Sequence, residues 1–473
     1  ARPTMAGGDA SGSKYGGYES SMPKLPDLPP ETNSSPMDLL RVPCKVKSVI
    51  VKGNKRTKRA LIEAQVAKAL QAGTYEELAL ELDSVNDNLQ SLDMFKKTVC
   101  EIDVAADGSS DEVNIAVEVD EKGTHTLSSG AYMQGGEGNF EFSWTGRNFT
   151  GNAERIQGNV SLGHKISNSF RLEASKPVTQ GSTSRHGISI FQSVLNLTKY
   201  SSYSETQRGM SLSREATDSE GGVHEFGYDA VWRNLHFTPK TALPPSGEAC
   251  DHFKSSLRHL YTVDTRDHRV VPSEGLLLRS NMELAGLLGD CKFFKHQMEG
   301  QVHLPLADDV TLSLSGALGY LQPLAGDSSR VSDRFFLGGP ILMRGFRTKG
   351  LGPRGSGSEA RSLARGGDLF YTAAADLAFP LPSNLLQMYG VKGHCFVNLG
   401  NNMAVRPKKN GKSGHVLSDI PDLLAKTRAV AGCGLVLPTA VGKLELNYCW
   451  PLRVLKDLGD RTARWQVGVA FDA

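Results

Sequence analysis

The 473-residue sequence contains no apolar run that approaches the ~18 residues a helix needs to cross a membrane. With a mean hydropathy of −0.29, this excludes a helical membrane protein. Neither sign of charge is in excess, because the sequence has 53 Lys and Arg and 51 Asp and Glu, a net charge of +2. Nothing in this balance indicates a nucleic-acid partner. The seven cysteines are scattered from Cys44 to Cys449 without CxxC spacing, and we expect free thiols.

Motifs for catalysis and metal binding are missing as well. The sequence has no HExxH, GxSxG or EF-hand pattern, and its 12 histidines are dispersed. Gly411-Lys412-Ser413 matches the end of a phosphate-binding loop, but Arg406 stands where that motif requires its first glycine. We therefore expect a protein that is not an enzyme and uses no metal or cofactor.

Glycine, serine and proline dominate the first part of the chain, residues 1–43, which ends in PKLPDLPPETNSSPMDLLRVP. A segment of this composition cannot bury enough apolar surface to fold, so we predict a disordered tail. It contains no apolar core of a secretory signal.

Residues 44–122 have the pattern of a small α+β domain. Thr74 and Glu77 form a capping box, which indicates the start of a helix with an apolar stripe. A further helix and three alternating segments surround it. The expected elements are a strand at 46–51, a helix capped by Thr57 and ended by Gly73, a second helix after Thr74, and strands at 99–104 and 113–119.

From residue 123 to residue 473, apolar and polar residues alternate in segments of about ten residues, the length at which tilted strands span a bilayer. Charges recur at mid-strand on the polar face, and aromatic residues such as Trp450 and Trp465 fall at segment ends. Because backbone groups in lipid must all be paired, such a sheet closes on itself. We predict a membrane all-β fold, a transmembrane β-barrel of about sixteen strands. A soluble β-sandwich, which also alternates, is the alternative.

A glycine-rich loop of roughly 40 residues, about 323–366, interrupts these strands, and a loop this long is unusual unless it has a function. It contains Leu337-Gly338-Gly339-Pro340 and then the tripeptide Arg344-Gly345-Phe346. With these motifs the sequence resembles the outer-membrane barrel-assembly superfamily, which includes bacterial BamA, plastid Toc and mitochondrial Sam barrels. The domain at 44–122 matches that family's POTRA order. DRFFLGGP, residues 396–401 and KLELNYCWP are most similar to the mitochondrial sorting-and-assembly branch.

The resemblance implies that the loop folds into the barrel lumen and that Arg344 pairs with acids on the wall. The position that matches the first family acid is Asp376. The second falls at Asn398, which cannot ionise, so either one carboxylate serves alone or Asp368 takes the second role. An unpaired buried arginine would be costly, which is the physical reason to expect a partner.

The resemblance also implies a lateral gate between the first and last barrel strands. The expected gate residues are Thr124, Thr126, Leu127, Ser128, Ser129, Gly130, Ala131 and Tyr132 in the first strand, and Trp465, Gln466, Val467, Gly468, Val469 and Phe471 in the last. An unpaired strand edge is a template for strand addition. Glycines near the first strand favour opening, because glycine weakens a strand.

The function implied is insertion and folding of β-barrel precursors in the mitochondrial outer membrane, with the POTRA domain in the intermembrane space. The implied partners are barrel precursors, metaxin-like cytosolic subunits, the import pore complex, intermembrane-space chaperones and outer-membrane lipid. Two alternatives remain open: a plastid-envelope translocase or insertase of the same superfamily, and a passive porin-like channel.

Overall fold

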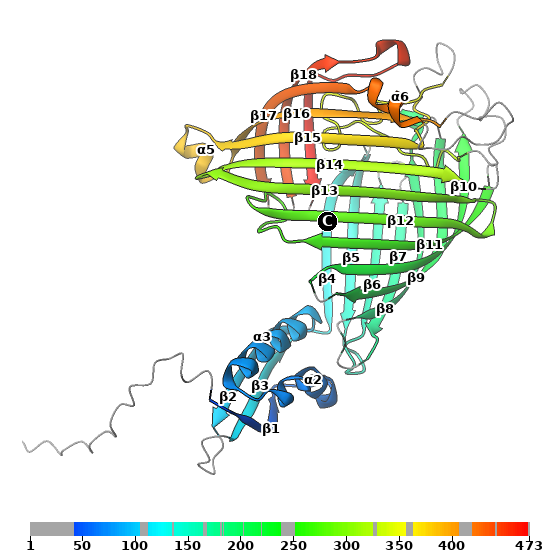
Figure 1. Cartoon of the computed structure of the whole chain (residues 1–473). Coiled ribbons are helices and arrows are strands. Elements are labelled where there is room, and N and C mark those ends of the chain that lie inside the picture. Colours follow the sequence, from blue (N-terminus) through cyan, green and yellow to red (C-terminus); the bar gives the residue numbers. More distant parts are fainter. Residues whose placement is uncertain are drawn as a thin grey trace, which may run out of the picture.

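The computed structural model describes residues 42–104, 112–134, 137–163, 168–179, 182, 184–201, 203–218, 220–237, 251–324, 329–355, 363–405, 419–439 and 442–471. They form a three-stranded α+β domain and a sixteen-stranded antiparallel sheet, the transmembrane β-barrel (Figure 1). No helix in these ranges is long and apolar enough to cross a membrane. The tail expected at 1–43 lies almost wholly outside the described residues.

The N-terminal domain has the predicted order of strand, helix, helix, strand and strand. Its sheet order is β1-β3-β2, with β1 parallel to β3. The apolar stripes of both helices pack on one face of this sheet, where residues such as Leu61, Leu78 and Ile115 are fully buried. The elements are β1 (Lys45–Lys52), α2 (Arg59–Val66), the 3₁₀ turn η1 (Ala69–Gln71), α3 (Tyr75–Ser91), β2 (Phe95–Val104) and β3 (Glu112–Glu121).

Helix capping in this domain agrees with the prediction at one helix and differs at the other. Thr74 caps α3, since its hydroxyl accepts the Glu77 N–H (3.3 Å), and the Glu77 carboxylate accepts the Gly73 N–H (2.9 Å). Thr57 does not cap α2, whose N-cap is Lys58. Its hydroxyl instead accepts a bond from the Asn148 side chain in the barrel (2.8 Å), so a tertiary contact has replaced the local one.

The barrel contains the sixteen strands expected from the alternation of the sequence. Outward side chains such as Phe170 and Leu172 are exposed apolar residues, as lipid contact requires. The strands are β4 (His125–Gln134), β5 (Glu137–Arg147), β6 (Arg155–Gly163), β7 (Asn168–Pro177), β8 (Arg185–Asn196), β9 (Tyr203–Thr217), β10 (Val223–Phe237), β11 (Asp251–Asp264), β12 (Gly275–Gly289), β13 (Phe293–Ala307), β14 (Val310–Pro323), β15 (Leu369–Pro380), β16 (Lys392–Met403), β17 (Arg428–Thr439), β18 (Gly442–Arg453) and β19 (Trp465–Phe471). Short helices lie between them: α4 (Thr198–Ser201), α5 (Asn384–Met388), α6 (Ile420–Ala425) and η4 (Lys456–Leu458).

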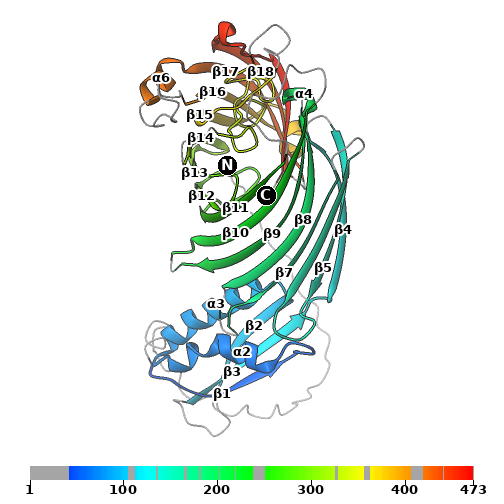
Figure 2. The ribbon, with the colours of Figure 1, turned by 90° about the vertical axis from the view of Figure 1, so that its right-hand side faces the viewer.

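Each barrel strand pairs with the next one in the chain, so the sheet runs in order from β4 to β19. Figure 2 shows β4 to β10 following one another along the wall and β11 to β18 continuing it above. Across the described residues, no register joins β4 to β19, and these two strands are the edges of the sheet. The seam is therefore where this barrel has unpaired backbone.

The N-terminal domain contacts the barrel through the turn at 148–154 between β5 and β6. The Lys58 N–H donates to the Gly151 carbonyl (3.0 Å), and Ala153 is buried in the core of the domain. Asp93 binds Lys122, just before β4, and Arg147 at the end of β5 (3.0 Å). The domain is thus joined to the barrel at the base of its first two strands.

Candidate functional site: the lumen loop and the edge strands

The loop between β14 and β15 turns back on itself, and its glycines make this possible. Gly338 has a φ of 115°, and a Cβ there would lie 2.4 Å from the Arg347 carbonyl oxygen. Gly345 has a φ of 83°, and a Cβ there would lie 2.5 Å from Val430 of β17. Gly339 (φ 115°) also has a conformation that favours glycine. The Gly-Gly and Arg-Gly-Phe motifs are therefore backbone requirements of one tight turn.

Apolar side chains hold this turn against the inside of the wall. Leu337, Met343 and Phe346 are almost fully buried. They share one cluster with wall residues, among them Phe370, Phe396, Val430 and Cys449. Burying a side chain of this size contributes roughly 1.5–3 kcal/mol. The loop therefore packs against the inner side of the wall.

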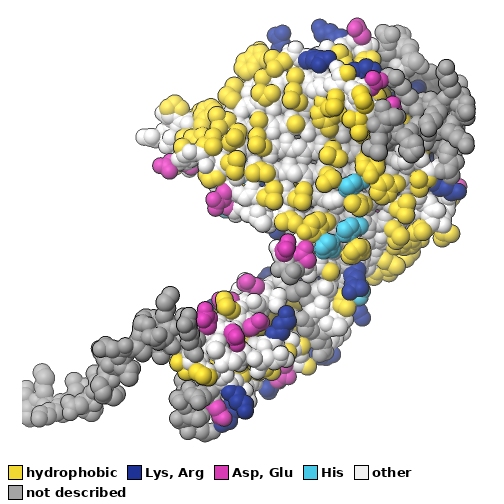
Figure 3. Space-filling view, viewed as in Figure 1, with side chains coloured by type: hydrophobic (Ala, Val, Ile, Leu, Met, Phe, Trp, Pro, Cys, Tyr) yellow, Lys and Arg dark blue, Asp and Glu magenta, His cyan; other side chains and the backbone are white. Residues whose placement is uncertain are grey.

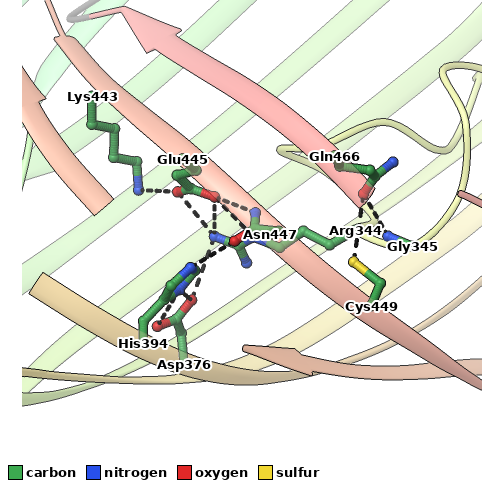
Figure 4. A network of polar contacts seen from close by, with 9 residues as sticks. All are labelled: Arg344, Gly345, Asp376, His394, Lys443, Glu445, Asn447, Cys449 and Gln466. Carbon is green, nitrogen blue, oxygen red and sulfur yellow. Dashed lines mark hydrogen bonds and ion pairs between the residues drawn. The ribbon is translucent and has the colours of Figure 1, made fainter. Parts of the chain in front are cut away.

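Arg344 projects from the turn into a buried ion pair on the wall (Figure 4). Its Nε and Nη2 donate to the two carboxylate oxygens of Glu445 in β18 (3.0 and 3.1 Å). Nη2 also lies 3.4 Å from Asp376 of β15, and the guanidinium lies over the Phe396 ring (4.8 Å). The two-pronged geometry is the one that a guanidinium makes best with a carboxylate.

Further polar groups complete the network around this pair. Lys443 lies 3.0 Å from Glu445, and the Asn447 amide donates to the same carboxylate (3.1 Å). His394 links Asp376 to Asn447, because its ring lies 2.9 Å from Asp376 and 2.7 Å from the Asn447 oxygen. A buried ion pair is stable only when its remaining donors and acceptors are satisfied, and this network supplies them.

The structure corrects the expected partners of Arg344. Asp376 is close to the guanidinium, but Asp368 is not: it lies 3.9 Å from Arg334 and accepts the Val405 N–H. The Asn398 amide meets the backbone N–H of Arg344 (3.0 Å) and not its guanidinium, and we orient the amide so that its oxygen accepts this bond. The second carboxylate is Glu445, which the sequence reasoning did not select. Its signal was an acid at an inward mid-strand position in KLELNYCWP.

The last strand is bonded directly to the loop. The Gly345 N–H donates to the Gln466 side-chain oxygen (2.7 Å), and the Gln466 amide donates to the Phe346 carbonyl (2.7 Å). A Cβ at Gly468, the next inward position of β19, would lie 3.0 Å from the Pro340 side chain. The segment before β19 adds a bond from Ala463 N–H to the Gly345 carbonyl (2.9 Å). Gln466, expected as a gate residue, thus also holds the Arg-Gly-Phe turn.

The other predicted gate residues lie along the two sheet edges. In β19, Trp465, Val467 and Val469 point outward and are exposed, whereas Gln466 and Gly468 are buried. In β4, Leu127 is 75% exposed, and a Cβ at Gly130 would meet no atom within 4 Å. Thr124 precedes β4, and Thr126, Ser128 and Ser129 lie within it. The side chains of Ala131, Tyr132 and Phe471 are outside the described set.

The opposite side of the loop is held by a second buried ion pair. Asp333 of the loop accepts from Arg233 of β10 (2.6 Å), and both side chains are nearly inaccessible. The Lys295 ammonium of β13 donates to the Asp333 carbonyl (2.8 Å), and Glu205 of β9 lies 3.8 Å from Arg233. The sequence reasoning missed this pair, since the two residues are 100 positions apart. The loop therefore bridges the lumen from β10 to β18.

A β-barrel with a lumen loop and an N-terminal α+β domain defines a class of outer-membrane protein, and the comparisons with known proteins agree. The Omp85 superfamily domain matches residues 148–472, and the POTRA family model, described as a surface antigen variable number repeat, matches residues 44–122. The chain belongs to the Omp85 superfamily, in which it stands with the sorting and assembly machinery component 50 proteins. Its role is in the assembly of β-barrel proteins, and it is not an enzyme.

Individual relatives cover nearly the whole chain. The human sorting and assembly machinery component 50 homolog is 30% identical over 90% of this chain and 89% of its own length. A SAM50-like protein of Schizosaccharomyces pombe is 28% identical over 91% of both chains. Among solved structures, BamA from Haemophilus ducreyi lacking POTRA domains 1–3 has a TM-score of 0.71 at 18% identity, covering 90% of this chain and 84% of that one. The BamA likeness concerns the fold alone.

Proposed function

We propose that this protein inserts and folds β-barrel precursors in the mitochondrial outer membrane by offering a strand edge between β4 and β19. A precursor strand cannot enter lipid until its backbone groups are paired, so an edge that pairs with it lowers the barrier to insertion. No covalent chemistry is needed. The last strand of the precursor would pair with β4, and later strands would add as hairpins.

The observation that carries this proposal is the order of the sheet. Throughout the described residues, fifteen neighbouring pairs follow from β4 to β19, but no register joins the ends. Strand edges left unpaired are normally covered or shortened, because they invite pairing with other chains. Here β4 is ten residues long and is not shortened, which suits it to receive a strand.

The proposed partners and location rest on the resemblance to the family. In this proposal the POTRA domain lies in the intermembrane space and receives precursors that arrive through the import pore complex with intermembrane-space chaperones. Metaxin-like subunits bind the cytosolic face, and outer-membrane lipid surrounds the barrel. The names of the relatives, which refer to sorting and assembly machinery, support this assignment.

A passive porin-like channel is less well supported, because a packed loop with buried ion pairs on two sides of the lumen leaves little room for flow. A plastid-envelope translocase or insertase would use the same edge. Imaging of the tagged full-length protein in cells separates the two locations, since it would show the protein around either mitochondria or plastids.

Site-specific photocrosslinking to a porin precursor arrested during import tests the strand-templating step. A photoreactive residue replaces Leu127 in β4, Val467 in β19, or Leu257 in β11, all outward and exposed. Leu257 is the matched control, because β11 has a paired strand on each side. We expect crosslinks from Leu127 to the last strand of the precursor and none from Leu257. Crosslinks of equal yield at all three positions would contradict templating at the seam.

A further inference from the structure

The outer wall of the barrel carries a row of three basic side chains on neighbouring strands. Lys176 of β7 lies opposite His186 of β8, and His186 lies opposite Arg214 of β9. All three are exposed and occupy the same outward face as Ile188 and Leu212. We call Lys176, His186 and Arg214 the basic row.

Lys176 and Arg214 each lie opposite His186, which places two permanent positive charges two strands apart on this face. On the outside of a membrane barrel such side chains are costly, since they must reach the interface to stay hydrated. Within the parts of the chain that the structure describes, the three residues form no ion pair with an acid. A bound anion would pair with these two charges.

An apolar hollow adjoins the basic row on the same face. It has a volume of about 390 Å³, and Ile156, Ala174 and Ile188 form its floor. These three residues are opposite one another on β6, β7 and β8, one outward position away from Lys176 and His186. The side chain of Ala174 is smaller than those of the two isoleucines beside it, and this difference creates the hollow. Glu154, also at the rim, accepts from Thr150 N–H and the Asn152 amide (both 3.4 Å), so its carboxylate is already engaged.

The basic row lies at the POTRA end of these strands. Lys176 is next to the last residue of β7 and His186 next to the first of β8. The neighbouring Arg185 donates to the Ala153 carbonyl in the turn that contacts the POTRA domain (3.0 Å). Figure 3 shows basic and histidine side chains gathered where β8 approaches the POTRA domain, with hydrophobic side chains above them. The basic row at the membrane surface suits a charged headgroup, and the apolar hollow toward the bilayer suits an acyl chain of the same molecule.

We propose that the basic row and the apolar hollow bind one anionic glycerophospholipid of the POTRA-side leaflet. Its phosphate lies among Lys176, His186 and Arg214, and one acyl chain fills the hollow over Ala174. Lysine and arginine supply two permanent charges, and the His186 ring between them can donate a hydrogen bond. The site differs from the lumen loop and both sheet edges, so it does not depend on the proposed assembly activity.

Native mass spectrometry of the full-length protein in detergent tests this site with two probes of identical acyl chains, phosphatidylglycerol and phosphatidylcholine. We expect the wild type to bind phosphatidylglycerol more tightly than phosphatidylcholine. In K176Q/R214Q the ratio of the two affinities should fall roughly fivefold for each charge removed. The control is Arg208→Gln, an exposed outward arginine nearer the other end of β9, which is bonded to Gln192 (2.8 Å). It should keep the preference. Phosphatidylcholine binding in the same samples reports whether each variant is folded.

A separate variant, Ala174→Trp, fills the hollow and should weaken binding of both lipids while leaving the basic row intact. Equal binding of the two lipids by the wild type would overturn the proposal. So would a preference that R208Q lowers as much as K176Q/R214Q does. Competition by inorganic phosphate alone, with no effect of Ala174→Trp, would identify a simple anion site and reject the lipid. Self-association that needs the basic row, without lipid preference, would reject it in favour of a second copy.

Discussion

The two edges of the barrel sheet are held in different ways. β19 is bonded along its inner face to the lumen loop, through Gln466 and the contact of Gly468 with Pro340. β4 has no such contact along its described length, and its ties lie at its base. There Arg147 N–H donates to the Thr124 carbonyl (2.8 Å), and the Arg147 guanidinium binds Asp93 of the POTRA domain.

This difference separates the two strands of the proposed gate into a fixed side and a movable side. Moving β19 would break two hydrogen bonds of Gln466 and disturb the buried turn that holds Arg344. Moving β4, together with β5 to which it is paired, breaks no bond to the loop within the described residues and changes the junction with the POTRA domain. We infer that the gate opens by displacement of β4, and that the loop keeps β19 in place. A precursor bound by the POTRA domain would then act on the movable edge.

The largest effect is expected from removing the ion pair of Arg344 and Glu445, because it fixes the loop that holds β19. Arg344→Ala removes the two-pronged partner of the buried Glu445 and leaves it only Lys443, and breaking a buried ion pair typically costs about 3–5 kcal/mol. We expect the loop to leave the wall and assembly of a porin precursor in isolated mitochondria to fall severely. The measurement is the yield of assembled porin, together with protease cleavage of the loop.

Arg347→Ala is the matched control, because Arg347 is in the same turn but exposed. Its side chain should contribute little, as exposed charges generally do. If both alanine variants assemble porin equally well, the ion pair is not what fixes the loop. Arg344→Lys should fall between them, since an ammonium cannot make the two-pronged contact with Glu445.

A smaller effect is expected from Gln466→Leu, which keeps the size of the side chain and removes both of its bonds to the loop. The Gly345 N–H would then be buried without a partner, at a cost of about 1–3 kcal/mol. The Phe346 carbonyl would lose one of its two donors and keep the Gly339 N–H (3.1 Å). β19 should become as movable as β4, seen as faster amide hydrogen exchange in β19. Gln157→Leu, a change in β6 away from the loop, should leave the exchange of β19 unaltered. Unchanged exchange in both variants would show that Gln466 does not hold the strand.

Strands and local turns could be predicted from the sequence because their signals are local. Alternation predicts about sixteen strands without their exact bounds, and the capping box at Thr74 and Glu77 fixes the start of α3. The Arg-Gly-Phe loop is recognised by its length and by its resemblance to the family motif, and the positive φ values of Gly338 and Gly345 explain why glycine stands at these positions.

The partners across the lumen could not be predicted in the same way. Inward positions of a barrel are mostly polar, so Glu445, Lys443 and Asn447 look alike in sequence. Which of them meets Arg344 depends on strand register and on how deep the loop enters, and both are tertiary properties. Thr57 failed as a cap for a related reason, because a barrel side chain competes for its hydroxyl.

The smallest effect is expected at the base of the movable side, from Asp93→Asn. Burial alone would raise the pKa of Asp93, but bonds from Lys122 and Arg147 outweigh it and hold the pKa below its ordinary value. A lowered pKa means that the ionised carboxylate stabilises the junction at neutral pH, and that this contribution disappears as the pH falls through the lowered value. Asparagine tolerates the positive φ of residue 93 (56°), so the substitution removes charge without straining the backbone.

We expect Asp93→Asn to weaken POTRA docking by about 1 kcal/mol at neutral pH, since the group is partly exposed and its ion pairs are screened by solvent. Hydrogen exchange at the 148–154 turn measures docking at pH 7 and again in acid. The wild type should approach the variant as the pH falls, because its carboxylate then becomes neutral too. Asp120→Asn, which removes an exposed acid 3.8 Å from Lys96, is the control and should change nothing at the turn. A difference between wild type and D93N that persists after Asp93 is protonated would mean that the junction is held by shape, and that β4 is less free to move than the contrast with β19 implies.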